Sequence, residues 1–108
     1  MGNKLLLMGG GEELGFFCPG CEQYHSFRFR RIETKDGPLW RWNYMNEKPT
    51  FSPSLLVNGA TEKRCHLYVR EGLILYLDDC WHGLRSQRVA MKEEEADPQV
   101  LALLPVMA

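Results

Sequence analysis

The cysteines at positions 18 and 21 form the pattern that most directly indicates chemistry in this sequence. They stand in Cys18-Pro19-Gly20-Cys21, a spacing that lets two thiolates point at one metal ion while proline and glycine shape the tight turn between them. A redox pair has the same spacing, but a redox C-x-x-C opens a helix, and no helical pattern follows Cys21. In a reducing compartment, clustered cysteines are more often metal ligands than disulfides. The motif therefore predicts one half of a Zn²⁺ site.

The second half of the metal site has more candidates than positions. Neighbouring residues on a strand point to opposite faces, so Cys65 and His66 are not expected to bind the same ion in an extended segment. Our first choice of ligands is Cys18, Cys21, Cys65 and Cys80, and the main variant is a Cys₃His site completed by His82, His25 or His66. A metal held by three or four cysteines is usually a closed structural site. We therefore expect one Zn²⁺ per chain that supports the fold.

A serine and a histidine outside our first choice of metal ligands suggest a second chemistry. Ser54 ends the segment T-F-S-P-S at a loop-to-strand junction, where capping of turns is the ordinary role of serine. The functional interpretation makes Ser54 a nucleophile and His66 its general base, because His66 faces away from the expected core. Asp78 or Asp79 could orient the imidazole, and Ser52 is the alternative nucleophile. Catalysis requires Ser54 and His66 to approach within about 3–4 Å.

Short strands separated by turn signals must position these residues. Alternation of apolar and polar residues with a period of two predicts an all-β fold of about seven short strands. The expected strands cover residues 3–8, 14–18, 25–32, 39–45, 54–57, 65–70, 73–77 and 86–91, with a loop over 46–53 and a hairpin turn at 71–72. Residues 1–91 form a single zinc-binding β-domain in this interpretation. Residues 92–108 form an acidic C-terminal tail, in which Asp97 caps a short helix that extends to Leu104.

Aromatic residues repeat along one side of two expected strands. Phe27 and Phe29 share a face of the first, and Trp40, Trp42 and Tyr44 share a face of the second. The buried face of a small β-domain produces this pattern, so we expect both faces to be largely buried. The alternative is an exposed stacking platform for single-stranded nucleic acid, with Trp81 added and Arg28, Arg30, Arg31 and Arg41 beside it.

The composition excludes several classes of protein. The chain has 108 residues, 44% of them hydrophobic, and a net charge of −1, which argues against a disordered protein and against a cationic nucleic-acid or membrane binder. The apolar run Leu5–Met8 is too short for a secretory signal, so we expect a cytoplasmic protein. The H-E-x-x-H pattern of zinc peptidases is absent, as is the H-x-E pattern of zinc deaminases.

The sequence resembles a family of small phage and bacterial proteins of uncharacterised function. The shared motifs are C-P-x-C at Cys18-Pro19-Gly20-Cys21, P-T-x-S-P-S at residues 49–54, and the Cys65-His66 pair. The D-C-W-H segment at residues 79–82 is similar to the phage branch, for which the host cytoplasm is the expected location. Members are often mislabelled as ammonia monooxygenases, a label that no copper-site pattern in this sequence supports. Relatives lie near bacterial ubiquitin-like conjugation genes, and the resemblance therefore implies a peptidase role for Ser54 and His66.

Two functions follow from these observations. The first is a small zinc-binding hydrolase, a peptidase that acts through Ser54 and His66 on the tail of a protein or peptide substrate. The second is a non-catalytic zinc module that binds a protein or single-stranded nucleic acid. A binding module would tolerate the loss of Ser54, and a nucleic-acid binder would lose affinity steeply with added salt.

Overall fold

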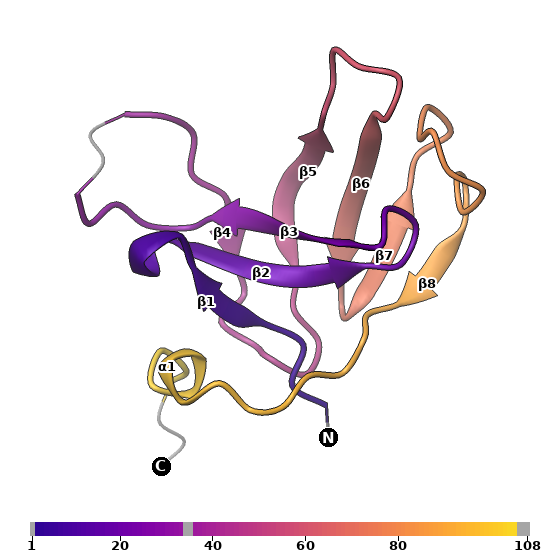
Figure 1. Cartoon of the computed structure of the whole chain (residues 1–108). Helices are drawn as coiled ribbons and strands as arrows, with labels where there is room; N and C mark the ends of the chain where they lie inside the picture. The colour runs from indigo at the N-terminus through magenta and orange to yellow at the C-terminus, as the bar shows by residue number, and fades with distance from the viewer. Residues whose placement is uncertain (1, 34–35, 106–108) are drawn as a thin grey trace.

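The chain folds into two antiparallel β-sheets and one short helix (Figure 1). The structure, a computed structural model, describes residues 2–33 and 36–105. The first sheet contains β1 (Leu6–Met8), β2 (Glu13–Cys18) and β3 (Gln23–Arg28), with a 3-10 turn, η1 (Gly9–Gly11), between β1 and β2. The second sheet contains β4 (Arg41–Trp42), β5 (Phe51–Val57), β6 (Cys65–Arg70), β7 (Leu73–Tyr76) and β8 (Arg88–Ala90) in that order, and α1 (Pro98–Leu101) follows. The predicted all-β fold with a C-terminal helix is confirmed.

An aromatic core joins the two sheets, whose strands cross in projection in Figure 1. The ring of Phe27 on β3 stacks on the ring of Phe51 on β5, with centroids 4.1 Å apart and planes 1° apart. Phe16 on β2 also stacks on Phe27, with ring centroids 5.5 Å apart. Full burial of a phenylalanine side chain contributes about 1.5–3 kcal/mol to the free energy of folding. The inner face of the second sheet is therefore fixed against the first sheet, and its other face is left open.

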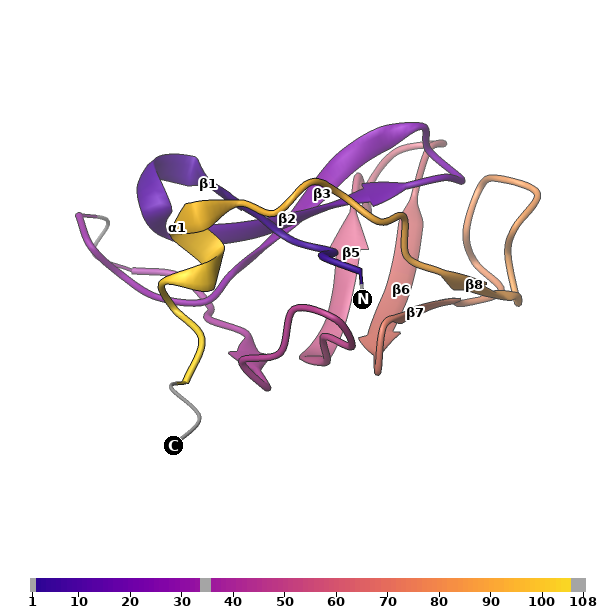
Figure 2. The ribbon, with the colours of Figure 1, turned by 90° about the horizontal axis from the view of Figure 1, so that it is seen from below.

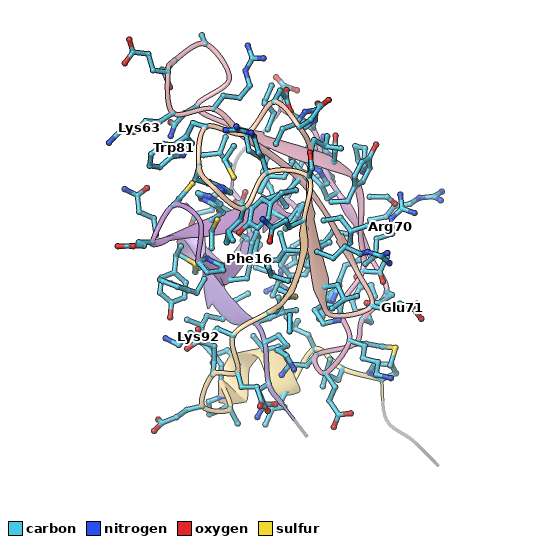
Figure 3. All side chains as sticks on the ribbon, turned by 90° about the vertical axis from the view of Figure 1, so that its right-hand side faces the viewer. Phe16, Lys63, Arg70, Glu71, Trp81 and Lys92 are labelled. Carbon is cyan, nitrogen blue, oxygen red and sulfur yellow. The ribbon has the colours of Figure 1, made fainter. Side chains whose placement is uncertain are left out.

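A two-residue hairpin fixes which residues of β6 lie on each face. Glu71 and Gly72 connect β6 to β7 with φ angles of 48° and 79°, the left-handed conformation that such tight turns require. The register pairs Arg70 with Leu73, as the predicted hairpin requires. The alternation that follows buries Cys65, Leu67 and Val69 completely, while His66, Tyr68 and Arg70 face outward. Figure 3 shows Arg70 directed outward, on the side away from Phe16.

The strand predicted over residues 39–45 is much shorter than expected. Only Arg41 and Trp42 pair with β5, and Tyr44 has a φ of 57°. The side chain of Asn43 causes this early end, because its Oδ1 accepts from the N–H groups of both Met45 (3.3 Å) and Thr50 (3.0 Å). The chain therefore turns back at Asn43 instead of continuing along the sheet.

The burial of the aromatic side chains follows from this geometry. Phe27, Phe29 and Trp42 are buried as predicted, and Trp40 is partly buried. The prediction was wrong for Tyr44, which is 45% exposed because it lies beyond the end of β4. With most of the rings in the core, the described residues do not form the exposed stacking platform that a nucleic-acid binder would need.

The segment before Ser54 also differs from the prediction. Residues 46–53 were expected to form a loop, but β5 already begins at Phe51 and continues through Ser52 and Pro53. The pairing with β6 shifts register between Phe51 and Leu55, and proline is tolerated at such irregular positions because it cannot donate to a regular ladder. The serines therefore lie on a strand, with Ser54 directed to the open face.

The C-terminal segment returns to the first sheet (Figure 2). Asp97 caps α1 through its Oδ1, which accepts from the N–H of Gln99 (2.9 Å), while its Oδ2 accepts from the N–H of Leu7 (2.8 Å). Val100 of α1 is completely buried. The predicted cap is confirmed, but the helix ends at Leu101, short of the expected Leu104, and residues 106–108 of the predicted tail lie outside the described residues. None of the helices in the described ranges is long and apolar enough to cross a membrane.

Candidate active site and metal centre

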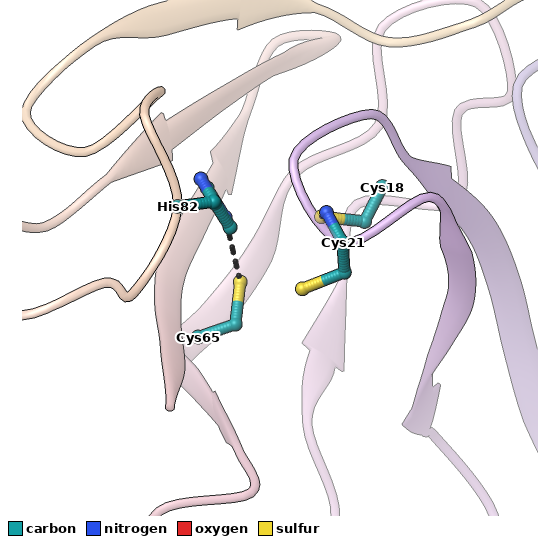
Figure 4. A group of neighbouring side chains, drawn as sticks. All are labelled: Cys18, Cys21, Cys65 and His82. Carbon is teal, nitrogen blue, oxygen red and sulfur yellow. Dashed lines mark hydrogen bonds between the residues drawn. The ribbon is translucent and has the colours of Figure 1, made fainter. Parts of the chain in front are cut away.

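Three cysteines and one histidine converge between the two sheets (Figure 4). Cys18 ends β2, Cys21 lies in the turn between β2 and β3, and Cys65 begins β6. His82 comes from the loop after β7. The ligand atoms of these four residues all lie within 4.8 Å of one another. Because the donors come from both sheets and from a loop, an ion held here would join three parts of the chain.

Hydrogen-bond donors surround the sulfur atoms of this cluster. The hydroxyl of Tyr76 lies 3.0 Å from Cys18 Sγ, which also accepts from the N–H of Cys21 at 3.4 Å. The indole N–H of Trp81 donates to Cys21 Sγ at 3.4 Å, and His82 Nε2 lies 3.4 Å from Cys65 Sγ. Donors of this kind stabilise thiolates, and metal-bound cysteines typically have them.

The pKa values of the three cluster cysteines are shifted by their mutual contacts and by burial. The pKa of Cys18 is lowered to about 3, chiefly by a hydrogen bond from Cys65 that outweighs the opposing effect of burial, with further help from His25 and Tyr76. The same interaction raises the pKa of the Cys65 thiol, and burial raises that of Cys21. A divalent cation would replace the retained protons and stabilise all three thiolates.

The turn between Cys18 and Cys21 is shaped to receive His82. A side chain at Gly20 would overlap the imidazole ring of His82, so glycine is required by the close approach of this ring. His82 Nδ1 lies 3.3 Å from the backbone N of Leu84, and the other ring nitrogen, Nε2, is directed at the cluster, 3.4 Å from Cys65 Sγ. The donor set of three sulfurs and one nitrogen matches the preference of Zn²⁺ for tetrahedral coordination by cysteine and histidine, so the residues fit the ion.

Cys80 and His25 lie outside this cluster. The structure places His82, and not Cys80, beside the three other cysteines, in agreement with the alternative ligand set. The reason is local, because Cys80 Sγ faces the main chain of His66, with His66 N at 3.2 Å and His66 O at 3.0 Å. His25 is buried, and its Nε2 has no hydrogen-bond partner among the described residues.

The structure brings Ser54 and His66 together on the open face of the second sheet. Ser54 Oγ lies 3.1 Å from His66 Nε2, within the range that proton transfer requires. The two strands are neighbours, and Leu56 is the direct partner of His66 in the register. Ser54 therefore lies diagonally across from the imidazole. Ser52, the alternative nucleophile, is paired with Arg41 of β4 on the other edge of β5.

Asp79 completes a line of three side chains. Its Oδ2 lies 3.3 Å from His66 Nδ1, so the two ring nitrogens of His66 face a hydroxyl on one side and a carboxylate on the other. The pKa of Asp79 lies below its usual value. Desolvation, the largest single effect, raises it, but the hydrogen bond and charge of His66 together with Arg64, whose Nη1 is 3.5 Å from Oδ2, outweigh this effect. The sequence left Asp78 and Asp79 open, since the choice depends on a turn.

This arrangement has the geometry of a serine hydrolase, in which a histidine contacts the serine hydroxyl with one ring nitrogen and is oriented by an acidic residue at the other. Residues 3–77 match the model of a protein family described as the bacterial ubiquitination-like system serine protease (BubE), and the chain belongs to this family. Cys18, Cys21, Ser54, Cys65 and His66 lie inside the matched region, whereas Asp79, Cys80 and His82 follow it. The comparisons with curated proteins and with solved structures gave no match.

Proposed function

We propose that this chain is a serine protease that cleaves the tail of a protein substrate through Ser54, His66 and Asp79. The observation that carries the proposal is the placement of His66, whose two ring nitrogens lie 3.1 Å from Ser54 Oγ and 3.3 Å from Asp79 Oδ2. The family description supports it, because it names a serine protease of a ubiquitination-like system.

The proposed reaction gives each member of the line a distinct role. Ser54 Oγ attacks the carbonyl carbon of the scissile bond while His66 Nε2 takes the hydroxyl proton. His66 then gives this proton to the leaving amine, and the substrate acyl group stays on Ser54 as an ester. Water, deprotonated by His66, hydrolyses the ester and restores the enzyme. Asp79 holds the imidazole in the required tautomer and stabilises its positive charge.

Zn²⁺ has a structural role in this proposal. Cys18, Cys21, Cys65 and His82 would supply all four ligands, which leaves no open position for substrate or for a reactive water. The ion would supply a fixed connection between the two sheets and the loop after β7. Cys65 is followed directly by His66, so the same strand would carry a metal ligand on one face and the general base on the other.

The substrate we propose is the tail of a ubiquitin-like protein. This class follows from the ubiquitination-like system named in the family description. The open face gives such a tail direct access, because Ser54 and His66 are only partly buried there. Leu56 lies opposite His66 and is 51% exposed, which offers an apolar contact to the substrate residue beside the scissile bond.

A fluorophosphonate probe tests this function without knowledge of the natural substrate. Ser54 Oγ would attack the phosphorus, the P–F bond would break and fluoride would leave, with the serine proton passing to His66. We expect one adduct on the native protein, located on Ser54 by peptide mapping, and none on the Ser54→Ala variant.

The matched control for this experiment is Ser52→Ala, which removes a hydroxyl two positions away on the same strand. This variant should still be labelled at the rate of the native protein. Labelling that persists in Ser54→Ala, or that disappears in Ser52→Ala alone, would contradict the proposed nucleophile.

A further inference from the structure

The thiol of Cys80 occupies a position that neither proposed site uses. It lies one residue after Asp79 and two before His82, yet it is not part of the metal cluster. Its side chain is buried, with 4% of the residue exposed, and Sγ lies 3.2 Å from His66 N and 3.0 Å from His66 O. Cys80 therefore contacts the backbone of the residue whose side chain is the proposed general base.

The end of β7 leaves the backbone N–H of His66 without its ladder acceptor, and the side chain of Cys80 supplies one. The ladder between β6 and β7 pairs Leu67 with Tyr76, and Leu77 N–H still donates to His66 O at 2.9 Å. A continued antiparallel ladder would also direct His66 N–H to the carbonyl of Leu77. That carbonyl instead accepts from Cys80 N–H at 3.3 Å, because the chain turns over residues 77–80. The sulfur of Cys80 then takes the place of the missing acceptor.

The same turn carries Asp79 to His66. Residues 77–80 form a four-residue turn closed by the contact between Cys80 N–H and Leu77 O, and Asp79 is its third residue. Two side-chain contacts of the turn are directed at His66: the carboxylate of Asp79 contacts the ring, and the thiol of Cys80 contacts the main chain. The distance between Asp79 and the ring therefore depends on how firmly the turn is held against β6.

We propose that Cys80 is a positioning residue of the active site. Its thiol accepts from His66 N–H, donates to His66 O, and so fixes the turn that places Asp79 beside the imidazole. The inference rests on the proposed function, and it deepens that function by explaining how an acidic residue on an exposed turn holds a defined position. Misplacement of a catalytic group by about 1 Å can lower a rate by on the order of 100-fold.

The test compares three substitutions of Cys80 by the rate of fluorophosphonate labelling at saturating probe. Cys80→Val replaces the thiol by a larger apolar side chain without donor or acceptor, and Cys80→Ala removes donor and acceptor without adding bulk. We expect both to lower the maximal labelling rate by on the order of 10- to 100-fold, with the half-saturating probe concentration and the zinc content unchanged. Cys80→Ser keeps both hydrogen-bonding functions and should recover most of the rate.

A double-mutant cycle with Asp79→Ala separates positioning from a general loss of stability. If Cys80 acts through Asp79, Cys80→Val should change the rate little once Asp79 is absent. Ile74→Ala, a truncation of a buried residue on the inner face of β7, serves as the control, because it lowers the melting temperature without contacting His66 or the turn.

The outcomes are distinguishable from a failure of the proposed function. If the native protein is not labelled at Ser54, the proposed function itself fails. If Ser54 is labelled but Cys80→Val reacts as fast as the native protein, or if its effect adds in full to that of Asp79→Ala, the positioning role is overturned. Loss of zinc from Cys80→Ser or Cys80→Val would overturn it as well, because Cys80 would then be a ligand. If neither Cys80→Val nor Cys80→Ala folds, the test rests on Cys80→Ser. A folded Cys80→Ser variant that is labelled slowly would then also contradict the positioning role.

Discussion

The two faces of β6 carry two sites of opposite character. On the inner face, Cys65 is completely buried and belongs to a cluster whose ligand atoms lie within 4.8 Å of one another. On the outer face, the side chain of His66 is 26% exposed and contacts Ser54 and Asp79. The inner site is enclosed by both sheets, whereas the outer site is open to a substrate. One strand therefore separates the proposed structural site from the proposed reactive site by a single residue.

The loop after β7 also contributes side chains to both faces of β6. Asp79 contacts His66 on the open face, Cys80 contacts the strand itself, and His82 joins the buried cluster. Both sites are thus completed by the same short segment, which lies beyond the residues matched by the family model. The comparison teaches that the candidate metal cluster and the proposed catalytic line share no side chain but are both held in place by β6 and the loop after β7.

Substitution of a cluster cysteine should have the largest effect. Cys21→Ser removes one thiolate, and because binding of structural Zn²⁺ contributes about 10–16 kcal/mol in small zinc domains, we expect the domain to lose zinc and unfold. Metal analysis and circular dichroism measure the two effects. Cys80→Ser is the matched control and should keep its zinc. A folded, zinc-loaded Cys21→Ser variant would contradict the proposed ligand set.

The two histidines should give opposite results. His66→Ala should lower the rate of Ser54 labelling by about 10²–10⁴-fold and leave the zinc content unchanged, because a general base is lost from the open face. His82→Ala should release zinc and destabilise the fold. The comparison of the two faces fails if His66→Ala loses zinc, or if His82→Ala retains both zinc and native stability.

Replacement of Asp79 should have a smaller effect than replacement of a cluster cysteine or of either histidine. Asp79→Asn leaves the base in place but removes the negative charge beside His66 Nδ1. The labelling rate should therefore fall, but the decrease should be smaller than that of His66→Ala by a factor of on the order of 10 or more. Asp78→Asn is the matched control, since Asp78 is the neighbouring acid and is exposed. Equal effects of the two substitutions would show that general electrostatics, and not orientation, is responsible.

The alternation of residues along strands made the fold and part of the sites predictable. A period of two placed Cys65 with Leu67 and Val69 on the buried face and His66 with Tyr68 on the other, as the structure has them. Periodicity has no meaning inside a turn, however. The sequence could not choose between Asp78 and Asp79, or between Cys80 and His82, because their directions depend on the turn over residues 77–80.

Side chains that compete with the backbone account for the other differences. Asn43 ends β4 by accepting two backbone N–H groups, which no alternation of apolar residues reveals. The irregular pairing around Pro53 let β5 begin earlier than a proline-containing segment suggests. In both cases a local hydrogen-bonding or register feature overrode the pattern on which the prediction rested.

Native mass spectrometry of the protein after reaction with a fluorophosphonate probe tests the central claim most directly. The account predicts a single species that carries one Zn²⁺ and one phosphonyl group, with the phosphonyl group on Ser54 and the ion retained. Zinc that is lost as the serine reacts would contradict two separate sites on the two faces of β6. An adduct on any residue other than Ser54 would contradict the proposed catalytic line.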